Sequence, residues 1–217
     1  IRYLGDDVPA ETLAWQDPLP DRDYKLISDR DVRKLEAAIA DSGLSNTQLV
    51  SNAWASASTY RATDMRGGAN GARIRIAPQN QWAINNPAEL AEVMAVLADV
   101  QDEFNSGLSR GKRVSLADVI VLAGNVGVER AADAFGVEVS IPFSPGRVDA
   151  IEGSVDAASW SVLEPRHDGF RNYMADLGFM SPSQALIDKA DRLNLTVSEM
   201  TVLLGGLRAM NANADGS

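Results

Sequence analysis

Six segments of the chain carry apolar side chains at helical spacing behind a polar residue that can cap a helix. In the first, Val32, Leu35 and Ile39 recur every three or four residues after Ser28, and Gly43 can end the helix. The six segments begin at Ser28, Ser45, Asn86, Ser115, Ser181 and Thr196. This spacing of apolar residues predicts a mostly helical protein.

The starts of these segments strengthen the prediction. An acidic or amide side chain follows each cap residue three positions later, which is the spacing of a capping box: Asp31, Gln48, Glu89, Asp118, Gln184 and Glu199. Pro87 and Pro182 stand where the first helical residue would be, a position that proline suits. The segment after Ser115 is apolar nearly all round, which predicts a buried helix whose Gly124 and Gly127 allow close approach of a neighbouring backbone.

The stretches between these segments show no helical or alternating pattern. Residues 61–82 are rich in glycine and arginine, residues 151–169 have no clear period, and residues 137–141 resemble a short extended piece before Pro142. The predicted fold class is therefore all-α, with long irregular loops.

Residues 1–27 are expected to form an extended interdomain arm, and residues 28–217 a helical domain. Three prolines oppose helix in the arm, and spaced aromatic side chains suit a segment laid over another surface: Tyr3, Trp15 and Tyr24. An ordinary N-terminal tail is the alternative interpretation. The sequence begins with isoleucine, and we interpret it as a piece of a longer protein.

Composition narrows the classes of function. The 217 residues include 45% apolar residues, enough for a substantial core, and carry a formal net charge of −10. That charge argues against nucleic acid or an anionic membrane as a partner. The absence of cysteine excludes disulfides, zinc–thiolate sites and cysteine nucleophiles. No apolar run approaches the roughly 20 residues needed to span a bilayer, and we expect a cytoplasmic protein without a metal site.

Two local features invite a chemical hypothesis. His167, the single histidine, lies in a polar, turn-like context, which favours a surface role over iron ligation. The glycine/arginine loop, residues 66–75, offers Arg66, Arg73 and Arg75 as grips for an anion. It lacks the phosphate-loop pattern, and we favour a tight loop whose arginines pair with nearby acids such as Asp64.

Several strings, taken in order, resemble the bacterial catalase-peroxidase family, specifically its C-terminal domain. The resemblance spans essentially the whole chain and depends on the order of many short matches. The clearest strings are Arg2-Tyr3-Leu4-Gly5, Trp15-Gln16-Asp17-Pro18, residues 53–59, residues 66–73, Ser115-Leu116-Ala117-Asp118, Pro142-Phe143-Ser144-Pro145-Gly146-Arg147, residues 168–173 and Gly205-Gly206-Leu207-Arg208.

The resemblance implies a peroxidase fold duplicated in one polypeptide, with haem b and catalysis in the N-terminal copy. Its distal Arg, Trp and His positions correspond to Ser51, Trp54 and Ala55 here. The proximal histidine position, after the glycine pair, is Leu207, and Asn85 matches the asparagine that would hold the distal histidine. Trp54 is expected to be a core residue, because no counterpart of its tyrosine cross-link partner is found.

The resemblance thus predicts a degenerate domain with no cofactor of its own. We expect no catalytic residue in it, the N-terminal haem domain as its partner, and a homo-oligomer as the full-length protein. The family's domain also continues beyond the position of Ser217, so we expect a truncated fold. Two alternatives stay open: an authentic peroxidase using His167, and an independent anion-binding module using the glycine/arginine loop.

Overall fold

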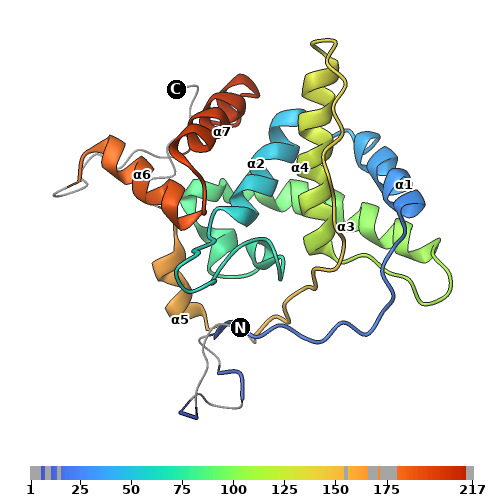
Figure 1. The fold of residues 1–217 in the computed structure, drawn as a ribbon. Coiled ribbons are helices and arrows are strands. Elements are labelled where there is room, and N and C mark those ends of the chain that lie inside the picture. Colours follow the sequence, from blue (N-terminus) through green and yellow to red (C-terminus); the bar gives the residue numbers. More distant parts are fainter. Residues whose placement is uncertain are drawn as a thin grey trace.

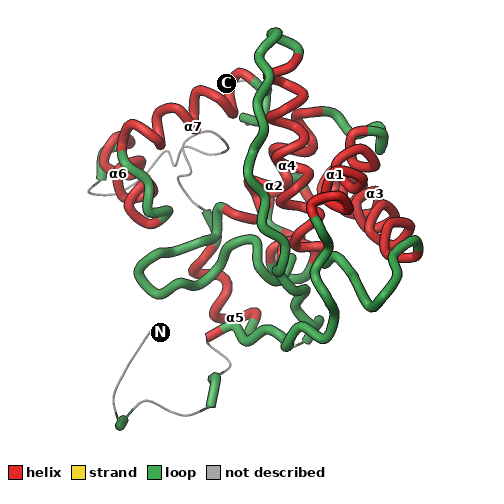
Figure 2. Tube along the Cα trace, turned by 45° about the vertical axis from the view of Figure 1, so that its right-hand side comes forward, coloured by secondary structure: helices red, strands yellow, loops and turns green. Residues whose placement is uncertain are grey.

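The computed structural model describes residues 6–7, 11–13, 16–153, 156–165, 171 and 180–213 (Figure 1). Within these ranges the regular structure is helical, and strand-like pairing is limited to the isolated bridges Lys25–Lys112, Arg61–Arg66 and Gly71–Asp149. Figure 2 shows helices joined by long loops, with no sheet. The predicted all-α class is confirmed. None of the described helices is both long enough and apolar enough to cross a membrane.

All six predicted helices form, and each begins after its predicted cap residue. Their bounds are α1 Asp29–Ala40, α2 Asn46–Ala57, α3 Pro87–Ser106, α4 Leu116–Asp133, α6 Pro182–Arg192 and α7 Val197–Ala209. Reciprocal capping boxes are present at Ser28, Ser45, Ser181 and Thr196. At α4 the Ser115 hydroxyl accepts from the backbone N–H of Asp118. The local side chains therefore fix where these helices start.

Short helical turns were not predicted. The structure adds α5 (Ala157–Trp160) and four 3₁₀ turns: η2 (Arg73–Arg75), η3 (Gln79–Gln81), η4 (Ala83–Asn85) and η5 (Ser161–Leu163). Three or four residues are too few for a hydrophobic period to appear in the sequence. These turns shape the loops on which the candidate site depends.

Helices α1 to α4 form the body of the molecule, with α2 crossing α4 most closely. A Cβ atom added at Gly124 would lie 2.6 Å from the Cβ of Ala53, and one at Gly127 would lie 2.8 Å from Val50. The predicted role of both glycines is confirmed: they let α2 approach α4. Every α2 residue is buried or half-buried, so this helix is covered on all sides.

Helices α6 and α7 form a hairpin on the opposite side of α2 from α1 (Figure 1). Helix α7 packs on the body through a small apolar cluster centred on Val50, Leu207 and Ala212. Helix α6 is tied to the chain that follows α2, because Lys189 Nζ donates to the carbonyl of Ser58 and the Ala62 N–H donates to the carbonyl of Arg192. The Thr47 hydroxyl also donates to the carbonyl of Met210, 2.9 Å away, which fastens the end of α7 to the start of α2. The hairpin is thus attached along one side.

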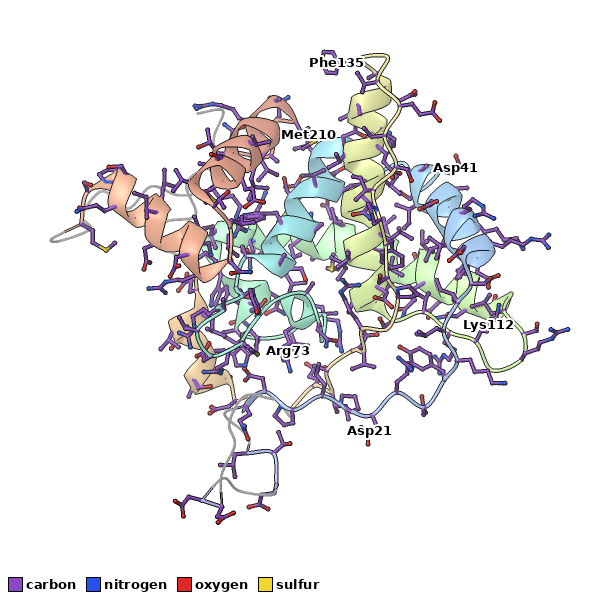
Figure 3. The ribbon with its side chains drawn as sticks, viewed as in Figure 1. Asp21, Asp41, Arg73, Lys112, Phe135 and Met210 are labelled. Atoms are coloured by element: carbon purple, nitrogen blue, oxygen red, sulfur yellow. The ribbon has the colours of Figure 1, made fainter. Side chains whose placement is uncertain are left out.

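The segment after α4 turns back along that helix, and the short extended piece predicted at residues 137–141 does not form a strand. Its Ile141 N–H donates to Glu129, and the N–H of Gly146 donates to Asp118 near the start of α4. Phe135, 87% exposed, stands at the tip of this turn (Figure 3). The segment is held by side chains of α4 and, at its start, by the Val137 N–H, which donates to the carbonyl of Ala132.

The described part of the predicted arm, residues 1–27, lies on the body. The Tyr24 hydroxyl donates to the carbonyl of Arg147 at 3.1 Å, and Lys25 pairs with the loop before α4. Ile27 joins the main core. Tyr3 and Trp15, predicted as partner contacts, lie outside the described residues, and the boundary between arm and domain stays a prediction.

Candidate functional site

The residues expected at the distal site lie on α2 but face two directions. Ser51 and Ala55 line a pocket of about 580 Å³. Trp54 is half-buried and packs on the other side, against the Val50–Leu207–Ala212 cluster. This alternation follows from helical geometry, since residues four apart share a face and adjacent residues do not. The structure therefore keeps an open pocket beside Ala55.

Three parts of the chain complete this pocket around α2. They are the turn from η4 into α3, the side chain of Arg171, and the residues that follow α7. The described lining is Thr47, Ser51, Asn52, Ala55, Ala83, Ile84, Asn85, Asn86, Pro87, Glu89, Arg171, Asn211, Ala212 and Asn213. Hydroxyls and amides dominate its polar atoms, and the lining contains no histidine.

Asn85 is 8% exposed and bonded on both sides of its amide. Its Nδ2 donates to the carbonyl of Gln79 at 2.9 Å, and its Oδ1 accepts from Nη1 of Arg171 at 2.8 Å. The other terminal nitrogen of Arg171 donates to the Ser58 hydroxyl at 2.9 Å. The Asn85 amide therefore links Gln79 of η3 to Arg171, and Arg171 links both to Ser58 at the end of α2.

Arg171 is the residue that sequence reasoning missed. It stands inside one of the strings that carry the family resemblance, residues 168–173. That string was given no role, because its contact with Asn85 spans 86 positions and leaves no local pattern. The one feature of the sequence that could have indicated its importance is a charged side chain within a string that matches the family.

Leu207 is packed among apolar side chains. It is 3% exposed and lies in the cluster with Val50 and Ala212, with Trp54 and Leu203 packed against it. It does not line the pocket beside Ala55. The two positions expected to flank a haem thus differ: one borders an open, polar pocket, and the other is packed shut.

The side chains at these positions do not fit haem chemistry. Haem iron in proteins takes nitrogen, sulfur or oxygen ligands from the axial side chain, and Leu207 offers none. Ala55 carries no group that could accept a proton from a bound peroxide. No grouping of three or more His, Asp or Glu side chains among the described residues could hold a metal ion. The single histidine, His167, lies outside those residues.

The glycine/arginine loop forms a second polar cluster around Asp17. Arg66 donates to both carboxylate oxygens of Asp17, at 2.7 and 3.0 Å, and to the Ser159 hydroxyl at 2.9 Å. The indole N–H of Trp160 donates to the same carboxylate at 2.9 Å. Arg73, labelled in Figure 3, lies over the Trp160 ring with its guanidinium carbon 5.1 Å from the ring centroid. Arm, loop and α5 meet at this cluster.

Other donors of the loop also point to internal acceptors, although Nε of Arg73 is buried without one among the described residues. Arg73 donates to the carbonyls of Asn70 and Asp17, at 2.9 and 2.8 Å, and Arg75 donates to the carbonyl of Ala150. Gly67 has a φ of +77°, and a Cβ there would lie 2.1 Å from the Thr59 carbonyl oxygen. The loop is a tight structural turn, as favoured from the sequence.

The identity of the acid partner was predicted wrongly. Asp64 pairs with Arg61 and accepts the backbone N–H of Arg66, whereas the guanidinium of Arg66 pairs with Asp17. Hydrogen bonding to Asp17 raises the pKa of Arg66, and burial lowers the pKa of Arg73. Because these guanidinium groups are engaged internally, the geometry counts against an anion site at residues 66–75.

Comparison with known proteins places the chain in a family. The peroxidase family model matches residues 10–215. Catalase-peroxidases from Bradyrhizobium sp. strain BTAi1 and strain ORS 278 are 57% and 59% identical to it, over 217 and 216 residues. The catalase-peroxidase of Hahella chejuensis is 58% identical over 212 residues.

These matches cover 98–100% of this chain but only 29–30% of each relative. The chain therefore spans about a third of the length of the relatives that it matches. Their resemblance runs through every described helix, and the all-helical architecture agrees with it. The chain belongs to the peroxidase family and is related along its whole length to the catalase-peroxidases.

Proposed function

We propose that this chain is a non-catalytic C-terminal domain of a catalase-peroxidase, which supports a haem b-bearing N-terminal domain in the same polypeptide. The parent enzyme would break down hydrogen peroxide and oxidise small donors. The observation that carries this proposal is chemical: alanine and serine border the pocket at the distal positions, and a buried leucine occupies the proximal one. The peroxidase architecture persists where its reactive side chains do not.

The pocket beside Ala55 lacks what peroxide cleavage would need. A base must take the proton from one peroxide oxygen, and a cation must stabilise the charge on the other. Arg171 is the guanidinium at the pocket, and its terminal nitrogens already bond to Asn85 and Ser58. Ser51 and Asn52 do not act as bases near neutral pH, and the carboxylate of Glu89, which also lines the pocket, already accepts a hydrogen bond from Nδ2 of Asn86 at 3.0 Å. We therefore assign the chain no catalytic step.

A supporting role is physically reasonable for a domain of this kind. Displacing a catalytic group by about 1 Å can reduce a rate about 100-fold. The relatives are more than three times as long as this chain, which leaves room for a separate catalytic domain. We further propose a cytoplasmic location and a homo-oligomeric parent enzyme, as the sequence predicts.

Haem titration tests whether this chain binds haem through one of its own side chains. Haem added to the 217-residue chain should give no Soret band characteristic of a protein axial ligand, and the His167→Ala variant should behave identically. A stable band that His167→Ala abolishes would establish a haem site and contradict the proposal.

A chimera tests the supporting role. The matching stretch of the Bradyrhizobium strain BTAi1 catalase-peroxidase is replaced by this chain, or deleted. We expect catalase activity in the replacement and at least a 100-fold loss on deletion. Full activity after deletion would show that the stretch gives no support. The unmodified relative is the reference for haem content in both proteins.

A further inference from the structure

The pocket beside Ala55 contains a buried acceptor that no described residue uses. Asn52 lines this pocket and is only 6% exposed. Its Nδ2 turns back along α2 and donates to the carbonyl of Gln48 at 2.9 Å, which leaves Oδ1 without a donor from the described part of the chain. A buried acceptor without a donor destabilises a folded protein, and native structures retain few of them. A molecule in the pocket could supply the missing donor.

A second polar group on the same wall is also unused. Ser51 precedes Asn52 in α2, is half-buried and lines the pocket. Its hydroxyl bonds to no described residue, whereas the hydroxyl of Thr47, one turn earlier, donates to the carbonyl of Met210. A hydroxyl can either donate or accept a hydrogen bond. The α2 wall therefore offers two adjacent side chains for hydrogen bonding to a ligand.

The start of α3 brings backbone donors to the same pocket. Asn86, Pro87 and Glu89 line it, and the first backbone hydrogen bond of the helix runs from the N–H of Leu90 to the carbonyl of Asn86. The Asn86 side chain does not cap this helix, because its amide donates to the Glu89 carboxylate at 3.0 Å. The N–H groups of Ala88 and Glu89 thus have no acceptor among the described residues.

The charges of the pocket wall balance each other. Glu89 and Arg171 are the charged side chains in the described lining. Glu89 accepts from Asn86, and the terminal nitrogens of Arg171 donate to Asn85 and Ser58. A charged ligand held here would need a counter-charge of its own, since burying an unpaired charge is strongly unfavourable. The wall therefore favours a neutral ligand.

Hydroxyl groups are the ligand chemistry that fits these partners. Oδ1 of Asn52 needs a donor, the N–H of Glu89 needs an acceptor, and the Ser51 hydroxyl can be either. A molecule with several hydroxyl groups can bond to all three. The other walls are mainly small and aliphatic, with alanine, isoleucine and proline side chains. The volume of about 580 Å³ lies within the usual range for small-molecule pockets.

We propose that the pocket beside Ala55 binds a small neutral polyol. One ligand hydroxyl donates to Oδ1 of Asn52, a second bonds to the hydroxyl of Ser51, and a third accepts from the first turn of α3. The inference goes beyond the proposed function and does not depend on it, because the site consists of residues of this chain. It assigns a binding role to a pocket for which the proposed function has no use.

Titration with three probes that share a six-membered ring tests the class of ligand. Addition of myo-inositol to the 217-residue chain should shift the amide NMR signals of Asn52 and Glu89, with a dissociation constant of about 1–10 mM for a ligand of about twelve non-hydrogen atoms. Cyclohexanol, with one hydroxyl, and inositol 1-phosphate, with added charge, should each bind at least about tenfold more weakly. No shift with myo-inositol, or equal or tighter binding of either other probe, would overturn the proposal.

Asn52→Leu separates binding from folding. Leucine has a similar volume and removes the unused acceptor, so myo-inositol binding should weaken about tenfold while the melting temperature stays the same or rises. Asn125→Leu makes the same change at a half-buried position of α4 outside the pocket, and should leave the dissociation constant unchanged.

Ser51→Ala gives a second variant in case Asn52→Leu fails to fold. Alanine suits a helix and removes one hydroxyl, so binding should weaken about threefold with the fold intact. If folded variants at Ser51 and Asn52 both bind myo-inositol as tightly as the unmodified chain, the proposal is wrong.

The same titration on the Bradyrhizobium chimera tests the site within a longer protein. Its dissociation constant for myo-inositol should agree with that of the 217-residue chain within about threefold. A chimera that binds no myo-inositol would mean that the rest of the polypeptide fills the pocket, and the proposal would fail. Catalase activity is a separate measurement, because a chimera that binds myo-inositol but lacks activity refutes only the supporting role.

Discussion

The body and the hairpin meet at α2, but they differ in how completely their helices are packed. On one side, α4 packs against α2 so closely that Gly124 has no room for a Cβ atom. On the other side, α7 touches α2 through Leu207 and leaves Val202, Gly205 and Gly206 uncovered by any described residue. The body is closed by its own helices, whereas no described residue covers the outward side of the hairpin. Similar helices in one chain can therefore differ in how completely they are packed.

The largest loss is expected where the body is tied to α5. Asp17→Asn removes the carboxylate charge that pairs with Arg66 and also acts electrostatically on Arg73, so two buried guanidinium groups lose their counter-charge. We expect the free energy of unfolding to fall by about 4 kcal/mol, measured by urea denaturation. Arg192→Gln, which breaks a half-exposed pair with Asp188 on α6, should cost about 1 kcal/mol or less. Equal effects would mean that the Asp17 cluster is solvated.

The next largest difference is expected between two leucine-to-alanine substitutions, one in the body and one in the hairpin. Leu122 of α4 is fully buried, whereas Leu186 of α6 is half-buried in the groove between α6 and α7. Leu122→Ala should lower the free energy of unfolding by about 3 kcal/mol, and Leu186→Ala by about 1 kcal/mol. Denaturation of both variants under one set of conditions gives the comparison. A larger loss at Leu186 would contradict the view that the hairpin is incompletely packed.

Cap residues test whether the hairpin opens by itself. Ser45 caps α2 and Thr196 caps α7, each through an N–H three residues later. Replacing either by alanine should cost about 1 kcal/mol. Hydrogen exchange should show the loss at Ser45 throughout the body, and the loss at Thr196 in α6 and α7 alone. Body-wide exchange after Thr196→Ala would mean that the two regions unfold together.

The smallest expected effect is a difference between the body and the hairpin in how their stability changes at low pH. Hydrogen bonds from Lys112 and Ser28 hold the pKa of Asp31, in the body, well below its usual value. The stabilisation is therefore present above the unfolded pKa of about 3.9 and is lost as the pH falls below it. Asp31→Asn should flatten the acid side of the stability curve. Glu199→Gln on α7, where a bond from Thr196 lowers the pKa of Glu199, should flatten it less.

The six long helices could be predicted because their signals are local. Each needs only a cap residue, a partner three positions later and an apolar rhythm, all of which lie within one short window. The buried state of α4 and the role of its two glycines followed from the same window. What these signals did not give is the number of neighbours that a helix has, and they did not indicate that α2 is covered on all sides.

The site was less predictable because its contacts join distant segments. Ser51, Ala55 and Leu207 were placed by the family resemblance, and no local pattern separates the open pocket beside Ala55 from the packed cluster around Leu207. Asp17 binds Arg66 across 49 positions, and Arg171 binds Asn85 across 86. Such pairings are fixed by tertiary structure. Only the order of matched strings hinted that these residues matter.

The crossing of α2 and α4 has room for one methyl group at its closest point. Ala53 supplies that group, and Gly124 makes way for it. Exchanging them, with Ala53→Gly and Gly124→Ala together, moves the methyl group across the contact without adding volume, so the pair should tolerate the exchange far better than Gly124→Ala alone. The two positions then behave as a single steric unit, and in diverging sequences a change at one constrains the other.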